Sequence, residues 1–311
     1  MARADRMPSA SLASTSTARR QGGFFTSNNP WLWLIPAIVF LLAYSIFPLI
    51  FNIVISLHEW RRREKFFRFV GGENWIELFQ DTRFLNSLGI TLQYVAAALI
   101  IQLFLGLIIA LLLDAQPWGV GIMQALIILP MVTAPAVAGM LFRLLTHSEF
   151  GVISKLLYNI GLLTPDEPLI GGRGTYALVG LLIVEIWQWT PFFVLIILAG
   201  LKGIPPEVIE ASQVDGANNW QRITRIKLPL LRTVLTVAIL FRLVDLYKVF
   251  DYVQIITSGG PASRTETLSY YNYANTFQTV NWGYGAAIGV FIMLLVWVSA
   301  FAYIRIFRVK L

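Results

Sequence analysis

The sequence predicts an all-α, polytopic membrane protein with six transmembrane helices. Residues of the set AVILMFWYC make up 57% of the chain, and charged residues make up only 13%. A soluble domain carries about 25% charged residues. Mean hydropathy is also high, at +0.67. A deficit of charge this large means that most of the surface does not face water, and the apolar residues gather into runs long enough to cross a bilayer.

The first 29 residues differ from the rest of the chain. Residues 1–29 are rich in Ser, Ala and Arg, and a segment with so few apolar residues cannot bury a core. We therefore expect a disordered cytoplasmic tail, followed by a transmembrane domain over residues 30–311. The apolar run 31–57 is too long for the core of a signal peptide, so we interpret it as a retained first membrane helix.

Membrane crossing as a helix takes about 20 apolar residues. Six runs meet this length: 31–57, 88–113, 122–145, 176–200, 231–256 and 285–307. Several of the runs contain proline, which a bundle tolerates because neighbouring helices satisfy the freed carbonyls. Lys and Arg are slightly more frequent in the segments that would be cytoplasmic if the N-terminus is inside. This excess predicts a cytoplasmic N-terminus, although the basic stretch Arg61–Lys65 counts against it.

Composition also narrows the chemistry. The chain has no cysteine and two histidines, His58 and His147, far apart in sequence, so we expect neither a metal site nor a catalytic thiol. The phosphate-binding pattern Gly-x-x-x-x-Gly-Lys does not occur. We expect no enzyme activity and no cofactor. The net charge of +7 is interpreted as basic clusters at membrane edges, with no nucleic-acid partner.

One predicted loop, residues 201–230, has the pattern of two short helices. Pro205 or Pro206 can begin the first helix, with Glu207 in its first turn, where the helix dipole favours an acid. Gly216 is a natural stop. Asn218 or Asn219 can cap a second helix, which we expect to end at Pro229. The product would be a helix–turn–helix finger suited to docking in the groove of a partner, rather than an ordinary linker.

This loop resembles the EAA motif of binding-protein-dependent ABC importer permeases. That pattern is Glu-Ala-Ala, three residues, Gly, nine residues, then Ile-x-Leu-Pro. Here Glu210, Ala211, Gly216 and the stretch Ile226–Pro229 stand in register, and Ser212 replaces the second Ala. Spacing thus agrees over the whole motif, and identity agrees at every fixed position except Ser212.

Further segments resemble sugar permeases of the maltose type. The stretch Thr257–Pro261 resembles their Thr-x-Gly-Gly-Pro, and Phe69–Trp75 resembles their Phe-Val-Gly-x-x-Asn-Tyr/Trp. Asn86 and Thr91 stand where the family has Asn-x-x-x-Thr, with one extra residue between them. The resemblance covers roughly residues 30–311 and implies the maltose-permease-like fold, as the first permease of a heterodimeric pair.

The resemblance implies a carbohydrate importer of the prokaryotic inner membrane. Its partners would be an ABC ATPase dimer, a second permease subunit, an extracytoplasmic solute-binding protein and membrane lipid, with an oligosaccharide, monosaccharide or polyol as substrate. ATP and Mg²⁺ would be bound by the ATPase. The residues expected to couple to that ATPase are Glu210, Ala211, Ser212, Asp215 and Gly216.

Polar side chains inside the predicted helices are candidates for the substrate site, because they are costly against lipid. They are Glu185, Gln188 and Trp189 in the fourth run, and Arg242 and Asp245 in the fifth. The resemblance places Glu185, Trp189 and the stretch Arg242–Asp245 near the sugar. The alternative is structural, because Arg242 can pair with Asp245, and Lys248 with Asp251, at spacing i, i+3. Glu185 has no basic residue within a turn, so it needs a partner from another helix or from the substrate.

The same intramembrane charges would also suit a second class of protein, an ion-coupled secondary transporter of a small polar solute. Such transporters often contain inverted repeats, and no convincing internal repeat is present in the sequence. The finger would also have no purpose in that class. A membrane enzyme is less favoured still, because no nucleophile–base pair stands out.

Overall fold

The computed structural model of the chain describes residues 30–61, 67–165, 169 and 176–307. The expected tail of residues 1–29 lies outside them. The chain divides into two compact units, Met1–Ile50 and Phe51–Leu311. Helix α1 (Pro30–Leu41) continues through the π-helical turn η1 (Leu42–Ile46) into α2 (Phe47–Ser56), and the boundary between the two units falls within α2. This forms an apolar segment long enough to span a membrane.

The second unit, in the part that the structure describes, has helices and one short hairpin as its regular elements. Its first half contains β1 (His58–Glu59), β2 (Arg68–Phe69), α3 (Glu73–Gln80), α4 (Thr82–Asp114), α5 (Val120–Val132), α6 (Pro135–Leu145) and α7 (Val152–Asn159). Its second half contains α8 (Ala177–Lys202), α9 (Pro206–Val214), α10 (Asn219–Gln221), η2 (Arg222–Lys227), α11 (Leu228–Leu230), α12 (Arg232–Leu246), η3 (Val253–Thr257), α13 (Leu268–Tyr273), η4 (Ala274–Gln278) and α14 (Trp282–Ile306).

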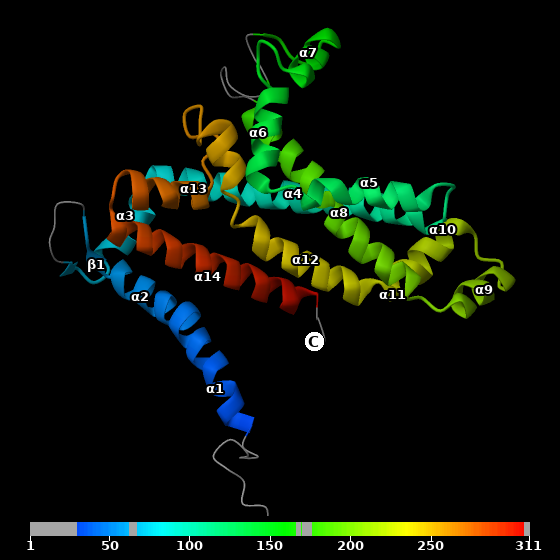
Figure 1. Ribbon diagram of the computed structural model, residues 1–311, viewed down its shortest axis with the longest axis horizontal. Coiled ribbons are helices and arrows are strands. Elements are labelled where there is room, and N and C mark those ends of the chain that lie inside the picture. Colours follow the sequence, from blue (N-terminus) through cyan, green and yellow to red (C-terminus); the bar gives the residue numbers. More distant parts are fainter. Residues whose placement is uncertain (1–29, 62–66, 166–168, 170–175, 308–311) are drawn as a thin grey trace, which may run out of the picture. The chain divides into compact units, whose positions relative to one another are not determined.

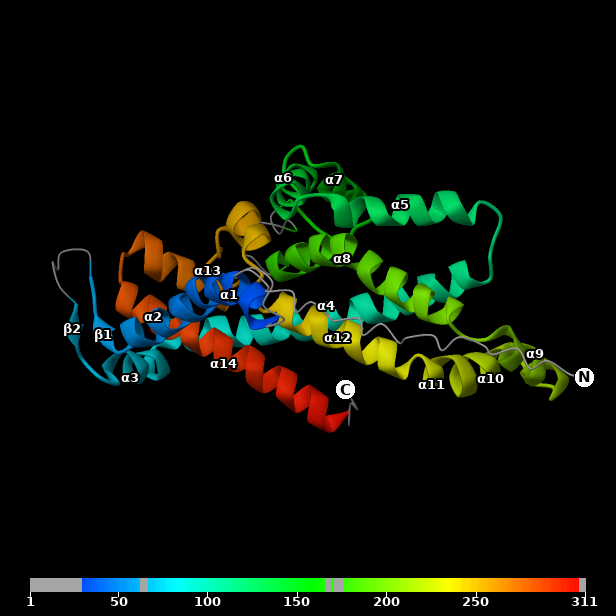
Figure 2. The ribbon, with the colours of Figure 1, turned by 60° about the horizontal axis from the view of Figure 1, so that its bottom comes forward.

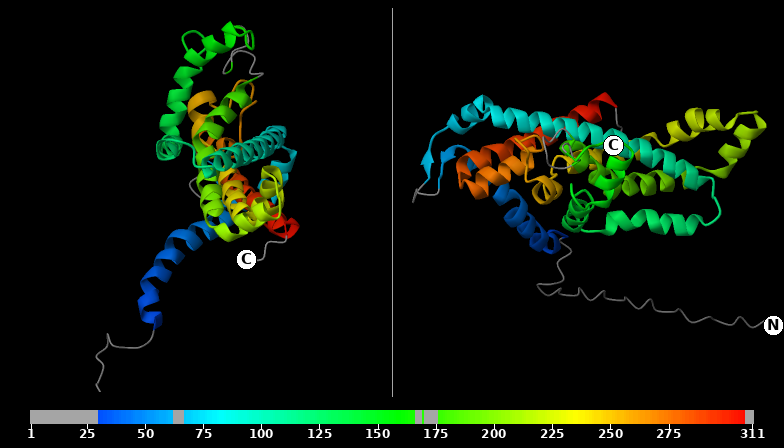
Figure 3. Two further views of the ribbon diagram at one scale, coloured as in Figure 1. Left: turned by 90° about the vertical axis from the view of Figure 1, so that its right-hand side faces the viewer. Right: turned by 90° about the horizontal axis from the view of Figure 1, so that it is seen from above.

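The long helices α4, α8, α12 and α14 form the body of this second unit. Helix α4 packs along α8, and α12 contacts α4, α8 and α14 (Figure 1). Helices α9, α10 and α11 lie at one end of the unit, and β1, β2 and α3 lie at the opposite end (Figure 2). The view from above in Figure 3 shows the same two ends opposite one another. The small residue Gly106 lets α4 approach α8, because a Cβ there would collide with Phe193.

Within the described residues, four helical segments are long and apolar enough to cross a membrane by themselves: Trp33–Ser56, α4, α8 and α14. The pair α5 and α6 passes the same test together but is bent by 96°. The predicted run 122–145 is therefore not one straight helix. Pro135 restricts Ala134 to an extended conformation (φ −61°, ψ 136°), which ends the helix before it.

The predicted run 231–256 is also interrupted, because α12 ends at Leu246. The carbonyls of Tyr247 and Val249, freed at this break, accept hydrogen bonds from the hydroxyls of Ser269 (2.9 Å) and Thr267 (3.1 Å). Irregular backbone is tolerated at membrane depth where protein groups satisfy it. This architecture is consistent with six membrane crossings, and that number stays a prediction.

Two of the family-like segments, Phe69–Trp75 and Asn86 to Thr91, are held by hydrogen bonds to backbone groups elsewhere in the chain. Asn74 is buried and donates to the carbonyls of Ser56 (2.9 Å) and His58 (3.0 Å). Asn86 donates to the carbonyl of Ser263 (3.1 Å), and the Thr91 hydroxyl accepts from the backbone amide of Leu268 (2.8 Å). The segment around Thr257–Pro261 is thus held against α4.

The α3–α4 junction, just beside those segments, carries a partly buried polar cluster. The Asp81 carboxylate accepts hydrogen bonds from the hydroxyls of Tyr271 and Tyr284, while Arg83 pairs with the buried Glu266 at 2.7 Å. Burial acts to raise the pKa of Asp81, but the hydrogen bonds from the two tyrosines and from backbone amides outweigh it, so that pKa lies below its ordinary value. Burial and the bond to Asp81 raise the pKa of Tyr271 to about 12.

Candidate functional site

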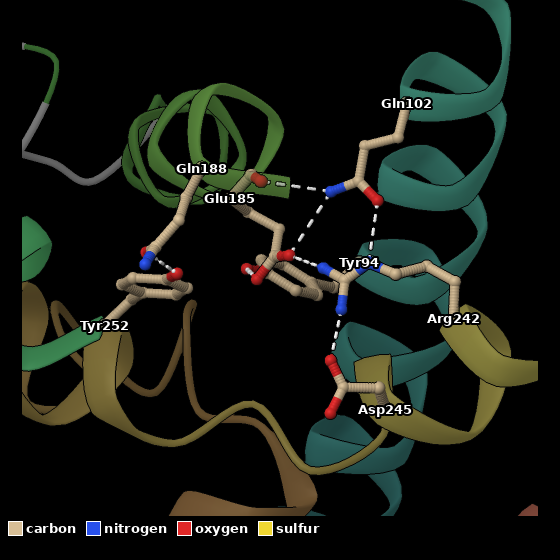
Figure 4. Close-up of polar contacts among 7 residues, drawn as sticks. All are labelled: Tyr94, Gln102, Glu185, Gln188, Arg242, Asp245 and Tyr252. Carbon is tan, nitrogen blue, oxygen red and sulfur yellow. Dashed lines mark hydrogen bonds and ion pairs between the residues drawn. The ribbon is translucent and has the colours of Figure 1, made fainter. Parts of the chain in front are cut away.

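A buried polar cluster joins three helices in the body of the second unit. Glu185 of α8 accepts hydrogen bonds from Tyr94 (2.9 Å) and Gln102 (3.2 Å) of α4 and forms an ion pair with Arg242 of α12 (Figure 4). Glu185 and Arg242 are each 3% exposed. The partner that Glu185 was expected to need from another helix is therefore Arg242.

The guanidinium nitrogens of Arg242 all bind side chains of the protein itself. It pairs with Glu185 and Asp245, and its Nε donates to Gln102 at 3.0 Å. Its Cζ also lies 4.6 Å from the ring centroid of Trp189, a cation–π geometry. The structural alternative considered from sequence is thus correct for Arg242–Asp245, whereas no Lys248–Asp251 ion pair occurs among the residues that the structure describes.

Gln188 belongs to a neighbouring part of the same region. Its Nε2 donates to the carbonyl of Thr133 at 2.5 Å, and its Oε1 accepts from the Tyr252 hydroxyl. Thr133 lies at the break between α5 and α6, and Tyr252 follows the break after α12. Gln188 therefore ties α8 to both helix breaks and does not contact Arg242 directly.

The structure adds three polar residues that sequence analysis missed: Tyr94, Gln102 and Tyr252 (Figure 4). A signal for Gln102 was available, since it is a lone amide within a long apolar stretch of α4, and such groups need a polar partner in a membrane. Tyr94 and Tyr252 carry no comparable signal, because tyrosines are common at the ends of apolar runs.

Two cavities that share residues border the cluster. One, of about 520 Å³, is lined by Trp189, Phe241, Arg242, Asp245 and Lys248 among others. The second, of about 100 Å³, reaches from Glu185 to Tyr252. The Asp245 side chain is 49% exposed. The cavity therefore offers a free carboxylate edge beside an indole, a combination that suits hydroxyl groups attached to an apolar ring face.

The finger predicted from residues 201–230 is present at the α9 end. Helix α9 begins at Pro206 with Glu207 in its first turn, and Gly216 has φ +79°, a conformation that glycine adopts readily. Asn218 and Gln221 form a reciprocal capping box. The second helix thus begins where the sequence predicted.

The end of that second helix was predicted wrongly, because Pro229 does not terminate it. Pro229 lies inside α11, directly after the π-helical turn η2. A π-helical turn is wider than an α-helical one. It therefore makes room for a ring that would otherwise clash with the carbonyl four residues earlier.

The expected coupling residues lie at the surface, with one exception. Glu210, Ala211, Asp215 and Gly216 are exposed, whereas Ser212 is 5% exposed and its hydroxyl donates to the carbonyl of Ile209 at 2.6 Å. Ser212 therefore supports the helix from within. Among the described residues, no group of three or more His, Cys, Asp or Glu side chains could hold a metal ion.

Comparison with known proteins identifies the family. Residues 102–310 match the family described as "binding-protein-dependent transport system inner membrane component". The chain is 33% identical to a probable ABC transporter permease of Sinorhizobium fredii, over 93% of each chain. It is 29% identical to a trehalose/maltose transport system permease of Thermococcus litoralis (90% of this chain and 94% of the relative). It is also 31% identical to a trehalose transport system permease of Mycobacterium tuberculosis (88% and 86%).

The fold agrees with a solved structure. A chain from the crystal structure of a bacterial ABC transporter that imports the acidic polysaccharide alginate superposes with a TM-score of 0.78, at 22% identity, over 90% of this chain and 94% of that one. The chain therefore belongs to the binding-protein-dependent transport system inner membrane components, the permease subunits of ABC transporters, and is a transport component rather than an enzyme.

Proposed function

We propose that this chain is the permease subunit of an ATP-driven importer that carries an uncharged carbohydrate into the cytoplasm. The observation that carries the proposal is the exposed finger, which displays Glu210, Ala211, Asp215 and Gly216 in the register of the EAA motif. A surface helix–turn–helix of this kind is suited to the groove of a partner. The family membership leaves no support for an ion-coupled secondary transporter.

The partner at the finger would be an ABC ATPase dimer, which binds the ATP and Mg²⁺. The finger end of the second unit would then face the cytoplasm, and the end with β1, β2 and α3 would face a solute-binding protein outside the inner membrane. A cytoplasmic N-terminus is part of the same proposal, and the slight excess of Lys and Arg in the cytoplasmic segments supports it. A second permease subunit would complete the pore.

An uncharged substrate is favoured by the way in which the charges of the cluster are used. The Arg242 guanidinium is bound by Glu185, Asp245 and Gln102 and covered by Trp189. It therefore has little capacity left for a carboxylate or a sulfonate of a substrate. The free edge of Asp245 accepts hydrogen bonds from hydroxyls and repels anions. We accordingly propose Asp245 and Trp189 as direct contacts, with Glu185, Gln188 and Arg242 shaping the site behind them.

The first test concerns the partner. The tagged chain is purified in mild detergent from its native host, and the proteins that accompany it are identified by mass spectrometry. We expect an ABC ATPase and a second permease. Glu210→Lys should uncouple ATP hydrolysis from transport, whereas Glu207→Lys, a matched charge reversal in the first turn of the same exposed helix, should not. Purification without any ATPase, or unchanged transport in Glu210→Lys, would contradict the proposal.

The second test concerns charge. Purified complex in proteoliposomes takes up radiolabelled trehalose, and unlabelled sugars compete with it. We expect neutral disaccharides to compete and uronic-acid disaccharides not to compete. Equal competition by the two kinds of sugar would overturn the assignment of an uncharged substrate while leaving the importer class intact.

A further inference from the structure

The finger is continuous with the helix that carries the buried cluster. Residues 219–246 are helical from α10 through η2 and α11 into α12, with a single turn residue at Leu231. Lys227 and Arg242 are 15 positions apart on this rod, which corresponds to about 22 Å at the α-helical rise. A displacement of the finger can therefore reach Arg242 mechanically, provided that nothing between them absorbs it.

The weak point of the rod is the π-helical turn Arg222–Lys227. A π-helical turn carries an additional residue and is less stable than an α-helical one. If this turn relaxed to α-helical geometry, the finger would rotate relative to α12 by about 100°, which is one residue of helical turn. Something must therefore hold the π-helical register if the finger is to keep its orientation.

An ion pair lies at the last residue of that turn. The Lys227 Nζ is 2.5 Å from the Asp114 Oδ2, and Asp114 is the last residue of α4. The two side chains are 21% and 19% exposed, so solvent screens this pair less than it screens an ion pair at a fully exposed surface. The pair also borders a cavity of about 320 Å³ between α4 and the finger.

An apolar contact lies one turn further along the rod. Leu231 is 1% exposed and packs with Leu113 and Leu201. It approaches α8 so closely that a Cβ on Gly200 would lie 2.6 Å from its side chain. The ends of α4 and α8 thus contact this helical rod at adjacent turns. The contact at Lys227 is an ion pair, whose strength depends on geometry, and the contact at Leu231 is apolar packing, which is non-directional.

We propose that the Asp114–Lys227 ion pair is the pivot that couples the finger to the substrate cluster. It holds the π-helical register, so that force applied at the finger turns α12 and moves Arg242 instead of unwinding η2. The proposal rests on the proposed function, because it assumes an ATPase at the finger. Both residues act by position, and neither contacts ATP or substrate.

The test uses the absence of cysteine from the chain. A single reporter, Phe241→Cys, is introduced at an exposed position that lines the cavity beside Arg242. The complex is purified with its ATPase, and the rate of maleimide labelling at this cysteine is measured by mass spectrometry, with and without ATP and vanadate. The backgrounds are the unaltered pair, Asp114→Lys, Lys227→Asp and the double exchange, with Lys202→Asp, at the exposed end of α8, as the matched control.

We expect ATP and vanadate to change the labelling rate in the unaltered and Lys202→Asp backgrounds. In each single variant the ATPase should still co-purify, while the change in rate falls by about fivefold or more, the usual scale of a coupling energy between sites. The double exchange should restore most of the response, because it rebuilds the pair with opposite polarity and shows that the single variants are not simply misfolded.

Two results would overturn the pivot: a full response in both single variants, or a double exchange that responds no better than they do. Failure of the proposed function has a different signature, because the unaltered chain would then purify without any ATPase. The two failures are therefore distinguishable in the same set of preparations.

Discussion

Removal of the Arg242 side chain should be among the most destabilising single changes in this protein. In Arg242→Ala, the Glu185 carboxylate stays 3% exposed and keeps only Tyr94 and Gln102 as partners. Loss of one member of a buried ion pair costs about 3–5 kcal/mol. For a chain of 311 residues, with an unfolding entropy of about 2.1 cal/mol/K per residue, that loss corresponds to a fall in Tm of roughly 5–8 °C. Thermal unfolding in mild detergent, followed by the fluorescence of the 10 tryptophans, measures it.

A double variant separates the cost of an orphaned charge from the cost of lost packing. Glu185→Gln combined with Arg242→Met removes both buried charges and keeps similar side-chain volume. Because replacement of a whole buried pair is often close to neutral, we expect it to recover at least half of the lost stability. Lys248→Ala, an exposed neighbour, should change little. An Arg242→Ala protein that melts within about 2 °C of the unaltered one would refute the reasoning.

Three further predictions follow from other contacts. Asp245→Asn should raise the KM for uptake of a neutral sugar by about tenfold, since a charged hydrogen bond contributes about 1.5–3 kcal/mol; uptake by proteoliposomes measures it, and an unchanged KM would remove Asp245 from the site. Gly106→Ala should destabilise by about 1–3 kcal/mol through overpacking against α8, whereas Gly89→Ala on the same helix, where a Cβ meets nothing within 4 Å, should not; equal melting of the two would contradict the close approach. Asp81→Asn should lower Tm by a constant amount from about pH 8 to about pH 5. Because the pKa of Asp81 in the folded protein is lowered, its carboxylate keeps its stabilising charge at every pH above the ordinary Asp value near 4. A difference in Tm between the two proteins that vanishes within that range would contradict the bonds to Asp81.

The class of protein and the finger could be predicted from the sequence because both depend on local information. The apolar runs indicate a membrane environment directly, because a helix of about 20 such residues matches the thickness of a bilayer. The finger follows from short-range rules for starting and stopping helices. Helix α9 begins at Pro206, Gly216 takes its positive φ, and Asn218 caps the next helix. Each of these features involves residues within a few positions of one another.

Hydropathy alone did not predict the helix breaks. It treats 122–145 and 231–256 as continuous runs, yet the chain bends at Ala134 and opens after Leu246. The bend at Ala134 follows from the adjacent Pro135, a local effect that hydropathy does not include. The opening after Leu246 depends on distant groups that satisfy the freed carbonyls, here the hydroxyls of Thr267 and Ser269. The error at Pro229 has a similar origin, because a π-helical turn leaves no clear pattern in the sequence.

The candidate site divides along the same line. The sequence by itself determined which residue types are costly inside a membrane, and so it identified Glu185, Arg242 and Asp245. The tertiary structure was needed to show that the Arg242 guanidinium pairs with Glu185 and that the Asp245 carboxylate keeps an exposed edge. The reason is that hydrogen-bond capacity is shared across helices: Gln102 is 83 positions from Glu185 and 140 from Arg242. Whether a buried charge is available to a substrate therefore depends on partners that only the packing of α4, α8 and α12 brings within reach.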